Sequence, residues 1–328
     1  MLPDTPSPTL SPFLIEPRFV ARVWGSRDLR PWYDHEAGDD PIGEVWLTGD
    51  ECLVQTGDHK GKSLAALFSE EPAALLGTDS AGTGSPLLIK MIFAREKLSV
   101  QVHPDDRLAH KYGHPRGKTE CWYALAAEPG AEVAVGIKPG VGLDQIRTGI
   151  EDCTLEKSLN LLPVAEGDMF FVDAGTVHAI WPGSILLETQ QNCDLTYRMY
   201  DYGRPRELHI DKSLEATRLT TRAGKVPAQP LADRNVLINV EYFRVERLLV
   251  DGQRISASLP GEGEAAPGLS YLFAAAGSAR IKSDSFESIT LPARGIVCVP
   301  ATTPAFTIED LNGDLDLIRI TPRSGPST

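Results

Sequence analysis

Short apolar runs rich in β-branched and aromatic residues recur along most of the chain, separated by Gly, Asp and Pro. Runs of this kind, bounded by turn-forming residues, are typical of β-strands. Many short strands with few helices favour a barrel or sandwich over a parallel α/β sheet. The runs are LLIKMIF (87–93), KLSVQVH (97–103), TECWYAL (119–125), EVAVGI (132–137), MFFVDAG (169–175), HAIWP (178–182), SILLETQQ (184–191) and LTYRMYDYG (195–203), and later VEYFRVERLLV (240–250), LSYLFAAA (269–276), GIVCVP (295–300), AFTIE (305–309) and DLDLIRI (314–320).

Two segments have helical rather than strand spacing. Residues 63–76 begin with Ser63, place Leu and Ala at helical intervals and are followed by Gly77, which predicts one short helix. Residues 141–162 have the apolar spacing of one or two helices. We expect the second segment to be a small helical insertion among the strands.

Composition shifts predict the domain boundaries. A Pro- and Ser-rich N-terminal arm covers residues 1–16, and a basic, Pro-containing stretch at 217–230 reads as a linker. The linker separates a larger domain at 17–216 from a C-terminal β domain at 231–328. We expect two β units joined by this linker.

A weak internal repeat relates these two units. FFVDAGTVHAI (170–180) is similar to VCVPATTPAFTI (297–308), because each has an apolar strand that runs into a tight turn and out again. His178 aligns with Ala305, so the second unit lacks a side chain able to bind a metal there. We therefore expect function in the first unit.

The charge of the chain restricts its partners. The formal net charge is -13 over 328 residues, which disfavours nucleic acid or an anionic membrane as a partner. No apolar run approaches the roughly 18 residues of a membrane helix, and the start of the chain lacks the pattern of a signal peptide. These features predict a cytoplasmic protein, and an anionic substrate would need a local cationic pocket.

Four residues are candidate metal ligands. Gln101 and His103 share one strand face with Ser99, Glu120 interrupts an apolar strand, and His178 follows a Gly-containing turn. A buried carboxylate needs a cation nearby, and two imidazoles, a carboxylate and an amide suit zinc, although manganese, iron, cobalt or nickel would also fit. The five cysteines show no C-x-x-C pair, so thiolate ligands are not indicated. Spacing alone leaves open whether the four side chains meet.

Charged residues cluster around the same segments. Lys118, Glu188, Asp194, Arg198 and Arg204 either form solvated strand faces or line the cavity beside His178. In the second case the cations would create a pocket for a small phosphorylated or carboxylated molecule. The chain has no phosphate-binding G-x-x-x-x-G-K-[ST] loop, no G-x-G-x-x-G and no G-x-S-x-G nucleophile elbow.

Several motifs, in order, resemble type I mannose-6-phosphate isomerases, most closely the short bacterial form. The resemblance runs from about residue 19 to residue 217. It rests on KLSVQVHPDD (97–106), GKTECWY (117–123), AGTVHAI (174–180) and QQNCDLTYRMYDYGR (190–204).

The resemblance implies a mainly β fold, with a catalytic cupin jelly-roll barrel followed by a second, degenerate cupin-like barrel. It implies one Zn²⁺ per chain and a small phosphorylated sugar as substrate, while the oligomeric state, monomer or homodimer, stays open. Two positions depart from the family pattern: Asp173 stands where Pro is expected, which puts the pose of His178 in question, and Cys193 stands where relatives often have Ser. The implied roles are zinc binding by Gln101, His103, Glu120 and His178, catalysis by Arg198, phosphate binding by Ser99 and Arg204, and acid or base chemistry by Lys118, Glu188 or Asp194.

The resulting hypothesis is interconversion of mannose 6-phosphate and fructose 6-phosphate through a cis-enediol. One alternative keeps the metal and changes the sugar or sugar phosphate. Another is a metal-binding sugar sensor without turnover, because a barrel can keep its ligands after losing its acid or base group.

Overall fold

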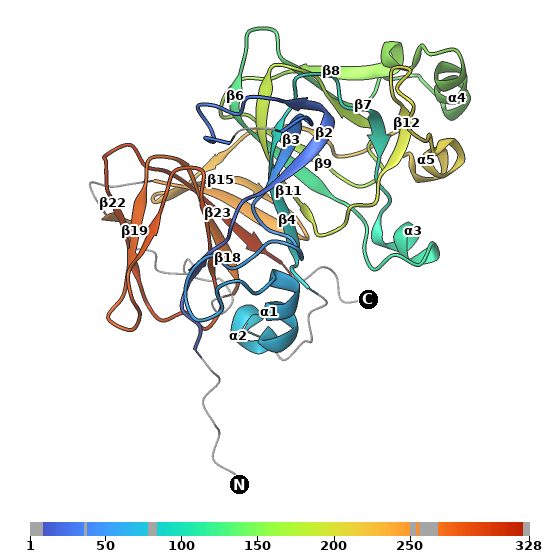
Figure 1. Cartoon of the computed structure of the whole chain (residues 1–328). Helices are drawn as coiled ribbons and strands as arrows, with labels where there is room; N and C mark the ends of the chain where they lie inside the picture. The colour runs from blue at the N-terminus through green and yellow to red at the C-terminus, as the bar shows by residue number, and fades with distance from the viewer. Residues whose placement is uncertain (1–8, 36–37, 78–83, 250–253, 256–267, 324–328) are drawn as a thin grey trace. The chain divides into compact units, whose positions relative to one another are not determined.

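The computed structural model describes residues 9–35, 38–77, 84–249, 254–255 and 268–323 (Figure 1). They form two compact β units, neither continuous in sequence. The first barrel comprises Phe19–Trp46 and Leu87–Pro227, and the second comprises Met1–Arg18, Leu47–Pro86 and Ala228–Thr328. Within the described residues, no helix has the length and apolar character needed to cross a bilayer.

The first barrel is built from two antiparallel sheets. The larger sheet has the order β13-β9-β6-β11-β4-β3-β2 and the smaller one the order β12-β5-β10-β7-β8. The strands are β2 Arg18–Ser26, β3 Ile42–Trp46, β4 Leu87–Phe93, β5 Val100–Val102, β6 Glu120–Ala127, β7 Glu132–Ile137, β8 Leu159–Pro163, β9 Met169–Val172, β10 His178–Ile180, β11 Ser184–Gln191, β12 Tyr197–Tyr200 and β13 Gly224–Val226.

Strand alternation divides the apolar residues of the first barrel between two cores. Trp122, Leu186 and Val133 belong to a core drawn from both sheets. Val100 and Val102 of β5 belong to another, together with residues of α4 Leu143–Glu151 and α5 Ile210–Ala216. Because neighbouring side chains on a strand point to opposite faces, Gln101 points away from the helix-covered core.

The predicted helical insertion is correct only for its first part. Helix α4 and the 3-10 turn η1 Leu155–Ser158 lie in it, but the last residues form β8, which pairs with β7. Two further short helices, α3 Asp106–Lys111 and α5, were not predicted. Both have few residues over which a helical period could be recognised.

The second barrel has the same two-sheet architecture. Its sheets have the orders β1-β21-β18-β23-β16-β15-β14 and β17-β22-β19-β20. The elements are β1 Phe13–Leu14, α1 Leu64–Glu70, α2 Pro72–Leu76, β14 Gln229–Pro230, β15 Arg234–Asn239, β16 Phe243–Leu248, β17 Arg254–Ile255, β18 Ser270–Ala276, β19 Ala279–Lys282, β20 Ile289–Leu291, β21 Ile296–Val299, β22 Thr307–Asp310 and β23 Asp316–Pro322. The fold class, a cupin-like mainly β protein, is thus as predicted.

The helix predicted at 63–76 is two short helices. Ser63 caps α1 by accepting from the backbone N–H of Ala66, and Gly77 ends α2 in the left-handed conformation, with φ of 73°. Pro72 cannot continue the hydrogen bonding of α1 and instead begins α2.

The domain boundaries differ from the predicted ones in two respects. Leu47–Pro86, placed by sequence in the 17–216 domain, lies in the second barrel, where Ile15 pairs with Val54 and the Ala301 N–H donates to the Leu75 carbonyl. The predicted linker at 217–230 contains β13, which pairs with β9, and β14, which pairs with β15. Part of the predicted arm, residues 1–8, lies outside the described residues; further along, Phe13–Leu14 pairs with β21.

Candidate functional site

The two sheets of the first barrel bring the four predicted metal ligands together. Gln101 lies on β5, His103 just after it, and His178 begins β10 and pairs with Gln101 across the smaller sheet. Glu120 begins β6 of the larger sheet. Ligand atoms of His103, Glu120 and His178 all lie within 4.8 Å of one another, and all three side chains are buried.

Distances within this group suit a shared cation. Glu120 Oε1 lies 3.3 Å from His178 Nε2, and Glu120 Oε2 lies 3.5 Å from His103 Nε2. The Gln101 amide Nε2 is 3.2 Å from His178 Nε2, and rotation of the amide would present its oxygen instead. Nitrogen and oxygen donors converge on one point, as the chemistry of a zinc-type site requires.

Backbone carbonyls fix the orientation of both imidazoles. His103 Nδ1 is 2.9 Å from the Leu195 carbonyl, and His178 Nδ1 is 2.9 Å from the Thr176 carbonyl. Since a carbonyl only accepts, each Nδ1 carries the proton and each Nε2 keeps its lone pair for the centre of the group. Burial lowers the pKa of His178 to about 4, and burial together with Lys118 holds the pKa of His103 well below its usual range. Both rings are therefore neutral near pH 7.

The turn before His178 is fastened by Asp173 rather than by the expected Pro. Asp173 Oδ1 accepts a hydrogen bond of 2.9 Å from the Thr176 hydroxyl, and the Thr176 N–H donates to the Asp173 carbonyl. Gly175, with φ of 90°, donates its N–H to the His103 carbonyl. One side-chain hydrogen bond and two backbone hydrogen bonds thus hold this turn where the resemblance led us to expect a proline.

A row of buried charges of alternating sign extends from the candidate ligands. Lys118 Nζ lies 2.9 Å from Glu120 and 3.6 Å from Glu188, Lys90 Nζ lies 3.3 Å from Glu188, and 3.3 Å separates Lys90 from Glu44. All five side chains are almost fully buried. Opposite charges offset the cost of removing each group from water.

This row shifts the pKa values of its members. Burial, followed by the charge of Glu120, raises the pKa of Glu188. Burial alone lowers the pKa of Lys90, but Glu188 and Glu44 more than compensate and raise it above its usual value. Burial raises the pKa of Glu44, yet Lys90 and Arg22 bring it down to about 2. Lys90 and Glu44 are therefore a charged pair at neutral pH, while Glu188 holds a proton more readily than an ordinary carboxyl.

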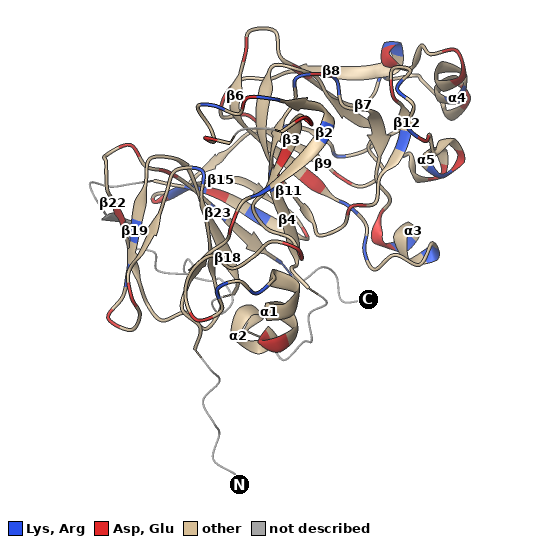
Figure 2. Cartoon of the chain, viewed as in Figure 1, with Lys and Arg blue, Asp and Glu red and all other residues tan. Residues whose placement is uncertain are grey.

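A cavity of about 360 Å³ opens beside the candidate metal ligands. Figure 2 shows a basic segment on β12 and an acidic segment on β3, the strands that contain Arg198 and Glu44. Trp24, Trp122 and Ile180 supply part of an apolar wall. Predicted residues that line the cavity are Ser99, Gln101, Lys118, Glu120, Glu188, Asp194 and Arg198, and charged residues that sequence reasoning missed are Arg22, Glu44, Lys90 and Arg206.

One of the missed residues, Lys90, could have been predicted from the sequence. Lys90 is the single charge within LLIKMIF, a strand that is buried throughout, so the cost of burying a lone charge applied to it as it did to Glu120. Of the two predicted phosphate-binding residues, Ser99 lines the cavity and Arg204 does not. Arg204 donates instead to Asp201 and to the Lys97 carbonyl.

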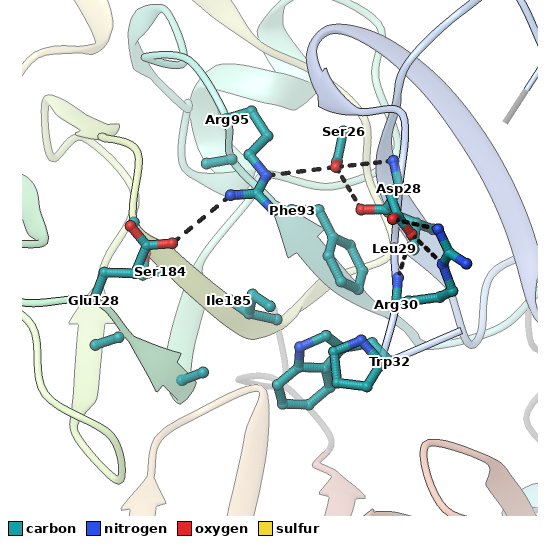
Figure 3. A pocket seen from close by; sticks show the side chains of 15 residues that line it. Ser26, Asp28, Leu29, Arg30, Trp32, Phe93, Arg95, Glu128, Ser184 and Ile185 are labelled. Atoms are coloured by element: carbon teal, nitrogen blue, oxygen red, sulfur yellow. Dashed lines mark hydrogen bonds and ion pairs between the residues drawn. The ribbon is translucent and has the colours of Figure 1, made fainter. Parts of the chain in front are cut away.

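A second cavity of about 270 Å³ lies elsewhere in the first barrel (Figure 3). Trp32, Phe93 and Ile185 give it an apolar side, and Arg95 lies 3.7 Å from Glu128 at its rim. None of the predicted site residues lines it. Seven of the predicted site residues instead line the larger cavity.

Fold and site together define a cupin-type barrel enzyme with a candidate metal centre. Residues 13–143 match the family model described as phosphomannose isomerase type I, catalytic domain. The mannose-6-phosphate isomerase of Streptococcus mutans is 34% identical over 74% of this chain and 79% of its own length. Mannose-6-phosphate isomerase ManA of Bacillus subtilis is 36% identical over 76% of this chain and 82% of its own.

Solved structures agree with these relatives. The mannose 6-phosphate isomerase of Bacillus subtilis superposes with a TM-score of 0.83 at 29% identity, covering 95% of this chain and 99% of that one. A mutant of phosphomannose isomerase from Salmonella typhimurium shares the fold, with a TM-score of 0.75 at 16% identity, covering 96% of this chain and 100% of that one. The chain belongs to the type I mannose-6-phosphate isomerase family and is an enzyme of this kind.

Proposed function

We propose that the enzyme uses one zinc ion to interconvert mannose 6-phosphate and fructose 6-phosphate through a cis-enediol. The observation that carries the proposal is the buried His103, Glu120 and His178 group beside a cavity lined by Lys118, Glu188 and Arg198. Two neutral imidazoles, a carboxylate and the Gln101 amide would hold the metal. When bound, zinc supplies an electrophile that stabilises negative charge on a sugar oxygen.

The reaction moves one proton between C1 and C2, and negative charge develops on O1 and O2. Arg198 is a suitable group to stabilise that charge, since it lines the cavity as a guanidinium. Its Nη1 donates a hydrogen bond of 3.0 Å to the Glu207 carbonyl, and this bond fixes one end of the side chain in advance of the reaction. Charge stabilisation by a fixed donor is most effective when the donor needs no rearrangement.

Among the three acid or base candidates, Glu188 is favoured. Its pKa is raised by burial and by the charge of Glu120, and a carboxyl with a raised pKa binds and returns a proton more readily than an ordinary one. Lys118 has the opposite tendency: burial lowers its pKa, but Glu120 and Glu188 more than compensate, so it stays a cation. We assign Lys118 to charge balance beside Glu120. Asp194 lines the same cavity and is the second choice.

Substitution of Arg198 by Ala tests this assignment. We expect Arg198→Ala to lower kcat by about 100-fold or more, the usual cost of losing a fixed charge-stabilising donor. Zinc content should stay at one per chain, because Arg198 is not among the proposed ligands. The measurements are a coupled assay for fructose 6-phosphate and metal analysis of the same sample.

A matched control is Arg147→Ala, which removes a half-exposed arginine of α4 that pairs with Asp211. Its kcat should equal that of the wild type. Full activity in Arg198→Ala would exclude Arg198 from the chemistry, and loss of zinc in that variant would mean that its effect is indirect. A panel of other sugar phosphates in the same assay separates this function from isomerisation of a different sugar.

A further inference from the structure

A turn just after β12 holds two arginines on one buried carboxylate. Asp201 is 2% exposed, and its two carboxylate oxygens accept from Arg206 Nε at 2.7 Å and Arg206 Nη2 at 2.6 Å. Arg204 Nη2 also lies 2.8 Å from Asp201 Oδ1. Two parallel bonds between a guanidinium and a carboxylate fix both position and plane, so Asp201 sets where Arg206 lies.

Arg204 and Arg206 differ in their hydrogen bonds and in their position relative to the cavity. Arg204 Nη2 donates a hydrogen bond of 2.7 Å to the Lys97 carbonyl, and Arg204 Nε donates one to Asp201. Arg204 does not line the cavity. Arg206 does line it. In the part of the chain that the structure describes, no hydrogen bond from Arg206 Nη1 is recorded, so this group can serve a ligand.

Two cations at this turn line the cavity. Arg204 and Arg206 both pair with Asp201, and Arg204 Nη1 also lies 3.7 Å from Glu96, outside the cavity. Arg198 and Arg206 are the two arginines of this region that line the cavity. In a chain with a net charge of -13, two guanidinium groups on one side of a cavity favour an anionic ligand.

We propose that Arg206, held in place by Asp201, is the guanidinium that selects the phosphorylated sugar, and that Arg204 serves to hold the turn. The inference rests on the proposed function and replaces the phosphate-binding role that resemblance gave to Arg204. Arg206 would donate to phosphate oxygens through Nη1, and Asp201 acts as a positioning residue. The phosphate end of the sugar would then lie toward Arg206, and the carbons that react toward Glu188.

The first test compares steady-state constants for mannose 6-phosphate with the inhibition constant of inorganic phosphate. Arg206→Ala should raise KM and the phosphate inhibition constant together by about 10- to 100-fold, the range expected for a charge-assisted hydrogen bond. The value of kcat should change far less. Arg204→Ala should lower the melting temperature while keeping KM within about threefold, since its side chain is outside the cavity. Arg206→Lys, which keeps the charge and loses the paired bonds, should fall between the wild type and Arg206→Ala.

Arg95→Ala is the control for loss of one positive charge, because Arg95 lies at the rim of the other cavity (Figure 3). Its KM should equal that of the wild type. An unchanged KM in Arg206→Ala, or an equal rise of KM in Arg204→Ala, would overturn the inference. If Arg206→Ala does not fold, an unchanged KM in Arg206→Lys overturns it instead.

Asp201→Asn separates positioning from simple charge. Removing a negative charge beside the cavity would by itself tighten phosphate binding, whereas loss of the clamp on Arg206 weakens it. We expect the phosphate inhibition constant to rise, and a fall would contradict a positioning role. Should the wild type fail to isomerise mannose 6-phosphate, the proposed function fails. Calorimetric binding of inorganic phosphate to the wild type and to Arg206→Ala would then still decide the inference.

Discussion

His103 and His178 show how a buried site keeps metal ligands ready. Each ring is 1% exposed and donates a hydrogen bond from Nδ1–H to a main-chain carbonyl, which leaves the lone pair on Nε2. His103 Nε2 lies 3.0 Å from Lys118 Nζ, and His178 Nε2 lies 3.3 Å from Glu120. A protonated imidazole cannot bind a metal, and burial favours the neutral form of both rings. The same burial that prepares the site makes the metal-free enzyme sensitive to acid.

The pH dependence of stability follows from these lowered pKa values. The unfolded chain takes up protons on both histidines below about pH 6.5, while folded His178 does so only near pH 4. In this window the free energy of unfolding of the metal-free enzyme should fall as pH falls, by up to about 1.4 kcal/mol per pH unit for each histidine. Above about pH 6.5 the two rings add no further dependence.

Denaturant titration of the metal-free protein at several pH values measures this slope. His178→Gln should reduce this slope by up to about 1.4 kcal/mol per pH unit, the value for one proton. Comparing the variant with the wild type cancels the contributions of other groups, such as Glu188. Identical slopes for the two proteins between pH 4.5 and 6.5 would contradict the assignment of a buried neutral His178.

The sequence predicted the candidate metal ligands but not all of the charged residues that line the cavity. Gln101, His103, Glu120 and His178 were predicted because strand alternation, the cost of burying a carboxylate and motif order agreed on them. Arg204 and Arg206 are two residues apart, and which of them lines the cavity depends on how Asp201 holds the turn. That choice is made by contacts that no local pattern encodes.

The element that carries His178 has a counterpart in the second barrel. Strand β9 leads through a turn to β10 in the other sheet of its barrel, and β21 leads in the same way to β22. The repeat predicted from 170–180 and 297–308 therefore corresponds to equivalent strand pairs. Ala305 lies just before β22, at the position that the alignment gives to His178.

The sheet of the second barrel carries its own buried charge cluster. Glu246 on β16 is 1% exposed and lies 3.4 Å from Arg234, 2.8 Å from Arg244 and 2.8 Å from Arg319 Nε. Arg234 and Arg319 are also buried. One carboxylate thus joins guanidinium groups from β15, β16 and β23.

Removing this carboxylate should destabilise the second barrel. We expect Glu246→Gln to lower the free energy of unfolding by about 3–5 kcal/mol, because it removes the carboxylate that pairs with the buried Arg319, while Arg234 keeps only its pair with Asp233. Zinc content of the folded protein should not change. Chemical unfolding followed by circular dichroism measures the loss. Glu70→Gln, which breaks the half-exposed pair with Lys62, should leave the unfolding midpoint almost unchanged, and an equal effect of both substitutions would refute this role of Glu246.

At the scale of the whole chain, the sequence pattern predicted that there are two β units, but not which segments belong to each. Two β units with few helices could be recognised, because strand alternation is local. The assignment of Leu47–Pro86 to the second barrel could not, because it depends on partners far away in sequence, such as Val54 with Ile15 and Leu75 with Ala301. The net charge of -13 was limited in the same way. It indicated that an anionic substrate would need a local cationic pocket, but not which arginines form that pocket.

Metal removal and restoration test the central claim, that a His103, Glu120 and His178 centre makes this family member a zinc-dependent mannose-6-phosphate isomerase. The measurement is fructose 6-phosphate formation from mannose 6-phosphate by chelator-stripped enzyme, before and after addition of one equivalent of Zn²⁺. We expect stripping to abolish activity and zinc to restore it in the wild type, and zinc to restore nothing in His178→Gln. Full activity of the stripped enzyme, verified as metal-free by elemental analysis, would contradict the account.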